Sequence, residues 1–371
     1  MRTITIIYDG ELYTFRWLKT LLWAKKQLKE LGYKLEFPSL YYYLPIHKRN
    51  EDIIKLFETR EYDIVLMAFH HSITELGIAT QEERAKVLSI VKSHCKKLIW
   101  MDTADSTGTC LFDVMPYVDL YMKKQMLKDK TQYLKEYYGG CMVYQYYHDK
   151  YNLNDHLLTR IYQPARQEYL SKMRVSWSLG MCDMFTNYHT AFLFPQKISI
   201  PKPSNCSYDQ RKYDVFYRGY AHSEIIGWQR HKCSELLMSY NDIKCPNAFE
   251  SVSPKEYQIE FKDSRAVVSP YGWGEVCFRD FEAFGNEVTL VKPDMSHCIT
   301  YPDVFLEGET YIPINWNFDG FRDVIADISN NRSKYKRIAS RGRELYLSYL
   351  DGVDAKRKFA NHFVTQLEKD E

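Results

Sequence analysis

Short apolar runs rich in β-branched and aromatic residues alternate with amphipathic stretches almost from the first residue. The runs Thr3–Tyr8 and Tyr62–Phe69 are typical of buried strands, and Arg16–Leu31 carries leucines at helical spacing before Gly32. Parallel strands need a long crossover, and a helix usually supplies it. This order of elements therefore predicts an α/β fold, a parallel sheet with helices on both of its faces.

The same alternation covers most of the chain, with one interruption. Before it, we expect further strands at Tyr33–Phe37, Lys97–Met101 and Val118–Met122, and helices near Asp52–Phe57 and at Gln81–His94. After it, we expect strands at Tyr213–Tyr217, Arg265–Ser269 and Val288–Lys292, and helices at Gly227–Tyr240, Pro254–Lys262, Glu275–Phe284, Gly320–Ser340 and Asp354–Leu367.

The interruption has the composition of a linker, because Pro195, Pro201 and Pro203 stand there among Ser, Asn and Lys. We expect one domain over residues 1–195, a linker over 196–212 and a second domain over 213–350. Each would be doubly wound and Rossmann-like, with a ligand in the cleft that the two domains face. No G-x-G-x-x-G follows any of the strands, so the dinucleotide fingerprint is absent.

Charge and cysteine usage exclude several classes of protein. Lys and Arg number 50 against 48 Asp and Glu, which argues against a nucleic-acid partner held by a positive field. The nine cysteines form no C-x-x-C pair, so neither a disulfide framework nor a zinc site is indicated. No apolar run of about 18 residues occurs, and Asp9 interrupts the N-terminal apolar run. We expect a cytoplasmic protein without a transmembrane segment.

The densest motif runs from Ser269 through Glu282, in the order strand, glycine-bearing turn, helix. Gly272 and Gly274 would let the backbone approach a ligand, and the helix start would offer N–H groups to an anion. Glu275, Arg279 and Glu282 stand at i, i+4 and i+7, which predicts one shared helix face. A guanidinium there suits a diphosphate and a carboxylate suits ribose hydroxyls. The alternative is an exposed Glu275–Arg279 pair of small energetic value.

The run SPYGWGEVCFRDFEAFGNEVTLVKPDM resembles the nucleotide-sugar-binding segment of glycosyltransferases with the two-domain GT-B fold, in particular the group 1 and exostosin-like families. The resemblance covers about residues 213–347. It implies that Glu282 holds the donor ribose, that Glu275 contacts the donor sugar, and that Arg218 and Gly219 contact the diphosphate. It also implies that the last helix, within 351–371, packs back on the first domain. The two glutamates are seven residues apart here, against eight in the group 1 pattern.

The resemblance implies a UDP- or GDP-linked sugar as the donor substrate, with no separate cofactor and no metal. The donor would also meet Tyr271, Gly272, Gly274 and Arg279. Asp294 and His297 follow the next strand, where a ligand-facing loop is expected, and would reach sugar hydroxyls or the diphosphate. A plain surface turn begun by Pro293 and Asp294 is the alternative.

Three loops at strand ends of the first half carry candidates for a general base. They hold Asp9 with Glu11, His70 with His71, and Asp102 with Asp105. We take Asp105 or His70 as the base, with helix capping as the alternative role of Asp105. Asp102 and Asp105 are three residues apart and do not form a D-x-D metal motif.

Taken together, the sequence predicts a glycosyltransferase that moves a hexosyl or pentosyl group from a nucleotide-diphosphate donor to a saccharide or glycan acceptor without a metal. Two alternatives stay open. One is an epimerase of the same fold, which would act on a nucleotide sugar without an acceptor. The other is a two-domain protein that binds a small ligand.

Overall fold

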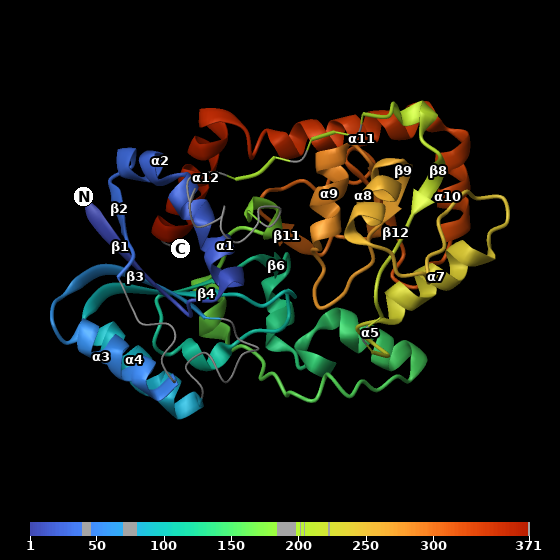
Figure 1. Cartoon of the computed structure of the whole chain (residues 1–371). Coiled ribbons are helices and arrows are strands. Elements are labelled where there is room, and N and C mark those ends of the chain that lie inside the picture. The colour runs from blue at the N-terminus through green and yellow to red at the C-terminus, as the bar shows by residue number, and fades with distance from the viewer. Residues whose placement is uncertain are drawn as a thin grey trace.

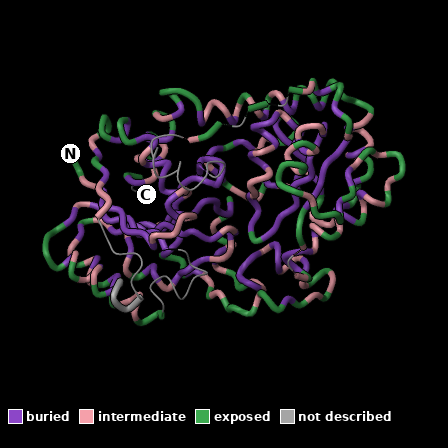
Figure 2. The backbone as a smooth tube through the Cα atoms, in the orientation of Figure 1, coloured by how far each residue is buried: buried purple, intermediate pink, exposed green. Residues whose placement is uncertain are grey.

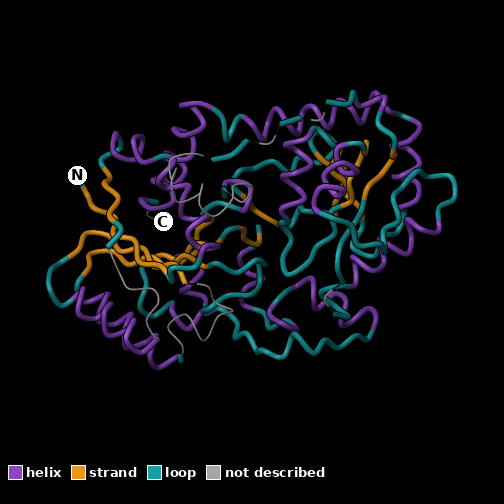
Figure 3. The backbone as a smooth tube through the Cα atoms, viewed as in Figure 1, coloured by secondary structure: helices purple, strands orange, loops and turns teal. Residues whose placement is uncertain are grey.

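The computed structural model describes residues 1–38, 46–69, 80–183, 198–200, 202–203, 205–221 and 223–369. In this part of the chain the strands form a six-stranded, a four-stranded and a two-stranded sheet. Figure 3 shows the strands of the two larger sheets gathered in two separate places, with helices around each. Figure 2 shows that the buried backbone follows the same two places.

The first half of the chain builds the six-stranded sheet, whose strand order is β2-β1-β3-β4-β5-β7. Every pairing between these strands is parallel. The elements are β1 (Arg2–Tyr8), α1 (Leu12–Trp23), α2 (Lys25–Glu30), β2 (Tyr33–Glu36), α3 (Ile46–Phe57), β3 (Tyr62–Phe69), α4 (Gln81–Ser93), β4 (Cys95–Asp102), β5 (Leu120–Lys123), β6 (Gln125–Leu127), α5 (Met142–Tyr151) and β7 (Met173–Val175).

Helices cover both faces of this sheet, because strand side chains alternate between two cores. Leu66 of β3 packs in the same core as Leu18 of α1, whereas its neighbour Val65 packs with Leu88 of α4. Apolar side chains therefore occupy both faces of each central strand, which is why these strands read as continuous apolar runs.

The second half builds the four-stranded parallel sheet, in the order β12-β10-β9-β8. Val267 of β9 packs with α8 and α9, and Val268 packs on the other face with α7 and α10. The elements are β8 (Tyr213–Phe216), α7 (Trp228–Ser239), α8 (Pro254–Lys262), β9 (Ser264–Val268), α9 (Phe278–Asn286), β10 (Thr289–Pro293), β11 (Cys298–Thr300), β12 (Tyr311–Ile314), α10 (Phe321–Asn330), α11 (Arg332–Leu347) and α12 (Gly352–Glu368).

Both halves are thus doubly wound and Rossmann-like, and one of the two cavities described below lies between them. This confirms the predicted fold class, α/β with two such units facing a cleft, the organisation that the term GT-B denotes. None of the helices that the structure describes is both long enough and apolar enough to cross a membrane.

The two halves are joined by an antiparallel pair in which β6 of the first half meets β11 of the second, with Met126 opposite Ile299. Close by, Glu275 accepts hydrogen bonds from Thr107, and the N–H of Ser178 donates to the carbonyl of Tyr301 at 2.6 Å. We call this region the junction. One apolar core runs through it from the first sheet to the second.

The helix α12 returns to the first half, where it lies beside α1 and α2 (Figure 1). Phe359 packs edge-on against Trp177 at 5.1 Å between ring centroids, and against Trp23 at 6.3 Å. His362 stacks on Tyr301 and its Nε2 lies 2.6 Å from the carbonyl oxygen of Ser176. The last helix therefore completes the core of the half that begins the chain.

Three features of the predicted element pattern need correction. The stretch Arg16–Leu31 is two helices, α1 and α2, which meet at Ala24. The strands β6, β7 and β11 were not expected, and each has only three residues, too few to show an alternation. The helix expected from Glu275 begins at Phe278, with Cys277 as its N-cap residue.

Candidate functional site

Two adjoining cavities open at the carboxyl ends of strands from both sheets, and we call them together the cleft. One, of about 490 Å³, lies within the second half and is lined by residues that include Gly219, Tyr220, Arg230, Phe249 and Tyr257. The other, of about 330 Å³, lies between the halves and includes Tyr13, Asp105, Arg230, Tyr257, Arg279 and Glu282 in its lining. Arg230 and Tyr257 belong to both. Parallel α/β sheets bind ligands at this end of their strands.

The second half contributes the start of α9 to the smaller cavity. Cys277 and Asp280 cap the helix, since the Asp280 carboxylate accepts from the N–H of Cys277 at 2.9 Å. Val276, Cys277 and Phe278 line the cavity, so the N-terminal end of the helix faces it. One turn further on, the Glu282 carboxylate accepts from the Tyr257 hydroxyl at 3.1 Å and from Gln258 at 3.0 Å. Glu282 is half-buried and held in one orientation at the cavity wall.

The first half contributes a carboxylate that a buried lysine and a tyrosine hold in place. Asp105 follows β4, and its side chain is 40% exposed. Lys124, fully buried, lies 3.0 Å from the Asp105 carboxylate, and the Tyr13 hydroxyl donates to the same oxygen at 2.8 Å. Lys124 also donates to Tyr13 at 2.7 Å and to the carbonyl of Thr103 at 2.6 Å. Burial raises the pKa of Tyr13 well above its usual value, and the nearby Asp105 adds to the shift.

The glycines of the turn serve contacts within the protein. A Cβ at Gly274 would lie 1.6 Å from the carbonyl oxygen of Asp105, and one at Gly272 would lie 2.1 Å from the Arg230 guanidinium. Only glycine therefore fits where the turn meets the first half. We expected these glycines to make room for a ligand. In the structure they leave room for Asp105 and Arg230, and Gly274 also lines the smaller cavity.

Glu275 does not share a helix face with Arg279 and Glu282, and that prediction was wrong. It precedes the helix cap, is 1% exposed, and points across the junction. Its carboxylate accepts from the Thr107 N–H at 2.9 Å and from the Thr107 hydroxyl at 2.7 Å. It is absent from the lining of both cavities of the cleft. The spacing misled because it assumed a helix that begins three residues too early.

Two of the residues expected at the donor, Arg218 and Tyr271, make hydrogen bonds within the protein, although Arg218 also lines the larger cavity. The Arg218 guanidinium forms a two-point ion pair with Glu260, at 2.7 and 3.0 Å, and donates to the carbonyls of Asn247 and Glu250. It thus braces the loop that walls the larger cavity. Tyr271 is 3% exposed and donates to the carbonyl of Asp294 at 2.5 Å, beneath the cavity surface. A Cβ at Gly219 would strike the Tyr217 ring.

Arg279 and Arg230 are better placed for an anion. Arg279 lines the smaller cavity, lies over the Tyr217 ring at 5.0 Å, and donates to the carbonyl of Arg218. Arg230 lies where the two cavities meet and donates to the carbonyls of Tyr220 at 2.9 Å and Tyr271 at 3.3 Å.

Asp294 and His297 lie outside the cleft. The Asp294 carboxylate accepts from the N–H and hydroxyl of Ser296, as in the surface turn that was the alternative reading. The ring of His297 lies at the junction beside Trp316, 5.1 Å between centroids. Burial lowers the pKa of His297, while the negative charges of Glu275 and Asp294 act in the opposite direction.

His70, the second candidate base, lies outside the residues that the structure describes, as does His71. Asp102 is fully buried and accepts from Tyr121 and Lys123 at 2.6 Å each, so it is no base for a ligand in the cleft. Sequence reasoning missed Tyr13 and Tyr257 as residues of the cleft. Neither stands in a recognisable spacing, and only the juxtaposition of α1 and α8 with β4 and α9 brings them there.

No family model matches the chain, and no curated protein sequence matches it. Solved structures do resemble it at low identity. Anabaena HepE, in complex with UDP-glucose, is 10% identical with a TM-score of 0.47, over 98% of this chain and 100% of that one. TarM is 10% identical with a TM-score of 0.48, over 86% and 58%. MurG of Acinetobacter baumannii is 9% identical with a TM-score of 0.38, over 98% and 100%.

Proposed function

We propose that the chain is a glycosyltransferase that moves a sugar from a nucleotide-diphosphate donor to a saccharide or glycan acceptor. The observation that carries the proposal is the cleft, in which a cavity within the second half adjoins one that reaches a fixed carboxylate of the first half. Such a pair of spaces suits a two-part donor, with the nucleoside in the larger cavity and the sugar in the smaller one. The resemblance of residues 213–347 to nucleotide-sugar-binding segments supports the same orientation.

In this proposal the second half binds the donor. Tyr220 and Phe249, which are 73% and 60% exposed, offer rings to the base in the larger cavity. Glu282 would accept from ribose hydroxyls. Arg230, Arg279 and the N-terminal end of α9 would face the diphosphate and stabilise the negative charge that grows on it as it leaves.

The first half would supply the base. In an inverting reaction, the acceptor oxygen forms a bond to the anomeric carbon while the bond from that carbon to the phosphate oxygen breaks. The acceptor proton passes to the Asp105 carboxylate, and the nucleoside diphosphate leaves with the electron pair. Lys124 and Tyr13 hold the carboxylate in its orientation, and every one of these steps uses side chains of the chain itself.

Nucleotide binding is the first test. The purified chain is heated with UDP, GDP, CMP, ADP, dTDP and NAD in turn, and a nucleotide at 100 times its dissociation constant should stabilise by about 2.7 kcal/mol. We expect one nucleoside diphosphate to stabilise the protein, less so in Glu282→Gln, and unchanged in Glu235→Gln, an exposed control on α7. If no nucleotide shifts the transition, the proposal fails and a protein that binds another small ligand takes its place.

Dependence on an acceptor separates transfer from epimerisation. We expect release of the nucleoside diphosphate from the matching sugar donor to accelerate when a saccharide acceptor is added. Conversion of the donor into its epimer without any acceptor would support an epimerase instead.

A further inference from the structure

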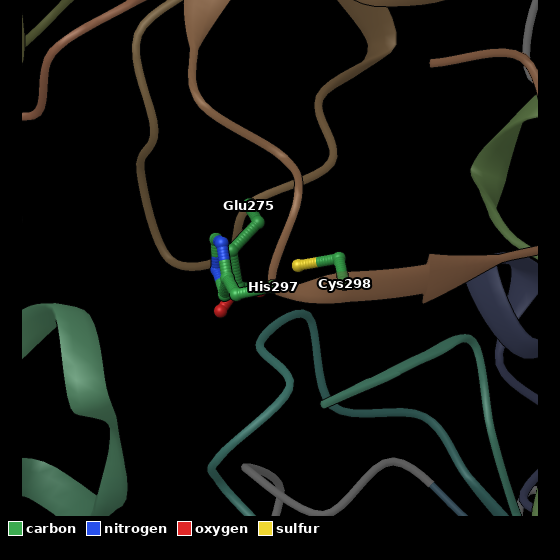
Figure 4. Close-up of side chains that lie close together, drawn as sticks. All are labelled: Glu275, His297 and Cys298. Atoms are coloured by element: carbon green, nitrogen blue, oxygen red, sulfur yellow. The ribbon is translucent and has the colours of Figure 1, made fainter. Parts of the chain in front are cut away.

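Three side chains of different chemistry converge at the junction. The carboxylate of Glu275, the imidazole of His297 and the thiol of Cys298 have ligand atoms within 4.8 Å of one another. Figure 4 shows the sulfur of Cys298 pointing toward the His297 ring and the carboxylate of Glu275. Glu275 comes from the turn before α9. Cys298 begins β11, the strand that pairs with β6, and His297 directly precedes it.

The cluster buries a negative charge that no basic side chain balances. Glu275 is 1% exposed, and no lysine or arginine of the described residues forms an ion pair with it. The two hydrogen bonds from Thr107 orient the carboxylate, but neutral donors leave its net charge in place. A buried carboxylate is normally paired with a cation or coordinates a metal.

The imidazole beside it lacks hydrogen-bond partners. Both ring nitrogens of His297 are enclosed, and neither makes a hydrogen bond of normal geometry within the described residues; the backbone of Asp294 interacts with the ring only weakly. Buried polar atoms without partners are rare in native proteins and call for an explanation such as an ion. Here a carboxylate without a cationic partner and an imidazole without a well-formed hydrogen bond lie side by side with a thiol.

The surroundings match those of a metal ligand set. Metal-bound carboxylates are usually held by further hydrogen bonds, as Thr107 holds Glu275. A second thiol is near, since the sulfur of Cys141 lies 3.9 Å from a carboxylate oxygen of Glu275. Thiolate with imidazole and carboxylate suits zinc, which takes four ligands in a tetrahedron, whereas magnesium and calcium prefer oxygen alone.

We propose that Glu275, His297 and Cys298 bind a zinc ion, with Cys141 or a water molecule as the fourth ligand. With Cys141 as the fourth ligand, the ion would tie the turn before α9 and the residues at the start of β11 to the first half, and so fasten the junction. None of the three ligands lines either cavity of the cleft, so the site is structural and separate from sugar transfer. The proposal does not depend on the proposed function.

Metal content and a cobalt spectrum test the site. The full-length chain, purified without a metal-affinity step, is stripped with a chelator, dialysed, and titrated with zinc or cobalt(II). We expect one zinc ion per chain, a thiolate-to-cobalt charge-transfer band in the near ultraviolet, and a higher melting temperature with zinc than without it. Cys298→Ser and His297→Gln should lose the tight site, and Cys298→Ser should lose the band. Cys206→Ser, which alters a thiol outside the cluster, should keep both.

The proposal is overturned if the folded wild-type chain takes up no zinc at equimolar concentration. It is equally overturned if cobalt binds without a thiolate band, or if Cys298→Ser and Cys206→Ser bind zinc alike. Circular dichroism shows whether each variant is folded. Should the His297 and Cys298 variants fail to fold, the wild-type stoichiometry and cobalt spectrum still decide. A failure here leaves nucleotide binding as before, so the two proposals are judged separately.

Discussion

The junction and the cleft are neighbouring regions of contact between the same two halves, yet the carboxylates in them differ in how far they are exposed. In the junction Glu275 is 1% exposed, and each of its oxygens accepts one hydrogen bond from Thr107. In the cleft Asp105 is 40% exposed at a cavity wall, although Lys124 and Tyr13 fix its position. The first arrangement holds the halves together, whereas the second keeps a carboxylate oriented and accessible. Access to a cavity, more than burial or hydrogen bonding, separates a group that can act on a ligand from one that cannot.

Glu275 and Glu282 show the same contrast between junction and cleft within one short stretch of the chain. They stand seven residues apart, a spacing that suggested equal access to a donor, but the cap at Cys277 turns the chain between them. One carboxylate enters the junction and the other lines the cleft. The difference teaches that the residue where a helix begins can decide the role of a side chain as firmly as its chemistry.

The largest expected effect is on the cleft side. Asp105→Asn keeps the shape of the side chain but cannot take a proton, so the rate of sugar transfer should fall by about 10²–10⁴-fold. Nucleotide affinity should stay within about twofold, because the donor is expected to bind to the second half. Steady-state kinetics and nucleotide titration measure the two quantities. The exposed Asp149→Asn serves as the control, and undiminished turnover of Asp105→Asn would remove Asp105 from the mechanism.

On the junction side, Glu275→Ala should lower the free energy of unfolding by about 3 kcal/mol, because two buried hydrogen bonds to a charged acceptor are lost. Chemical denaturation measures this change. The control variant Glu309→Ala, at an exposed position, should lower the free energy of unfolding by less than about 0.5 kcal/mol. A loss of nucleotide binding by folded Glu275→Ala would contradict the division between junction and cleft.

The junction should also weaken in acid through His362. Burial lowers the pKa of His362 to about 4, while the hydrogen bonds to the backbone of Ser176 and Val175 oppose that shift. The unfolded chain binds the proton near pH 6.5, so stability from this group is complete above that pH and is lost as pH falls toward 4. Between pH 7 and pH 5 the loss is about 2 kcal/mol.

Urea denaturation at the two pH values, compared between the wild type and His362→Gln, isolates this contribution. The variant should show a smaller decrease between pH 7 and pH 5, and the exposed His231→Gln should behave as the wild type does. An equal decrease in all three proteins would show that His362 does not supply the effect.

The smallest expected effect belongs to Glu282→Gln in the cleft. The change removes a charge but keeps a hydrogen-bond acceptor, so nucleoside diphosphate affinity should fall about tenfold, equivalent to about 1.4 kcal/mol. Because the side chain is half-buried and hydrogen-bonded to Tyr257 and Gln258, the free energy of unfolding should change by less than about 1 kcal/mol. Isothermal titration with the stabilising nucleotide gives the affinity. A large loss of stability with no loss of nucleotide affinity would show that Glu282 supports the fold and does not bind the nucleotide.

The sequence predicted the long elements well, because buried strands such as β3 and capped helices such as α8 carry strong local signals. Ser253 and Pro254 mark the start of α8 in the sequence itself, and the structure begins it at Pro254. The strands β6 and β11 carry no such signal, since each is three residues long and is stabilised by a partner far away in the chain.

The candidate site was predictable only in part, for a related reason. Asp105 and Glu282 could be selected from strand ends and helix spacing, and the structure places both at one cavity. The engagement of Arg218 could not be predicted, because its partner Glu260 stands 42 residues further on. The convergence of His297 and Cys298 with Glu275 was equally hidden, because it depends on the pairing of β11 with β6.

The return of α12 to the first sheet bears on how the chain can fold as it is made. Residues 352–368 leave the ribosome after both sheets, yet their Phe359 covers Trp23 and Trp177, and Glu368 pairs with Arg2. The first half therefore carries an uncovered aromatic surface throughout the synthesis of the second half. The second half can close the apolar core between its sheet and the helices α7 and α10 first, and the first half completes its packing only after α12 has been made.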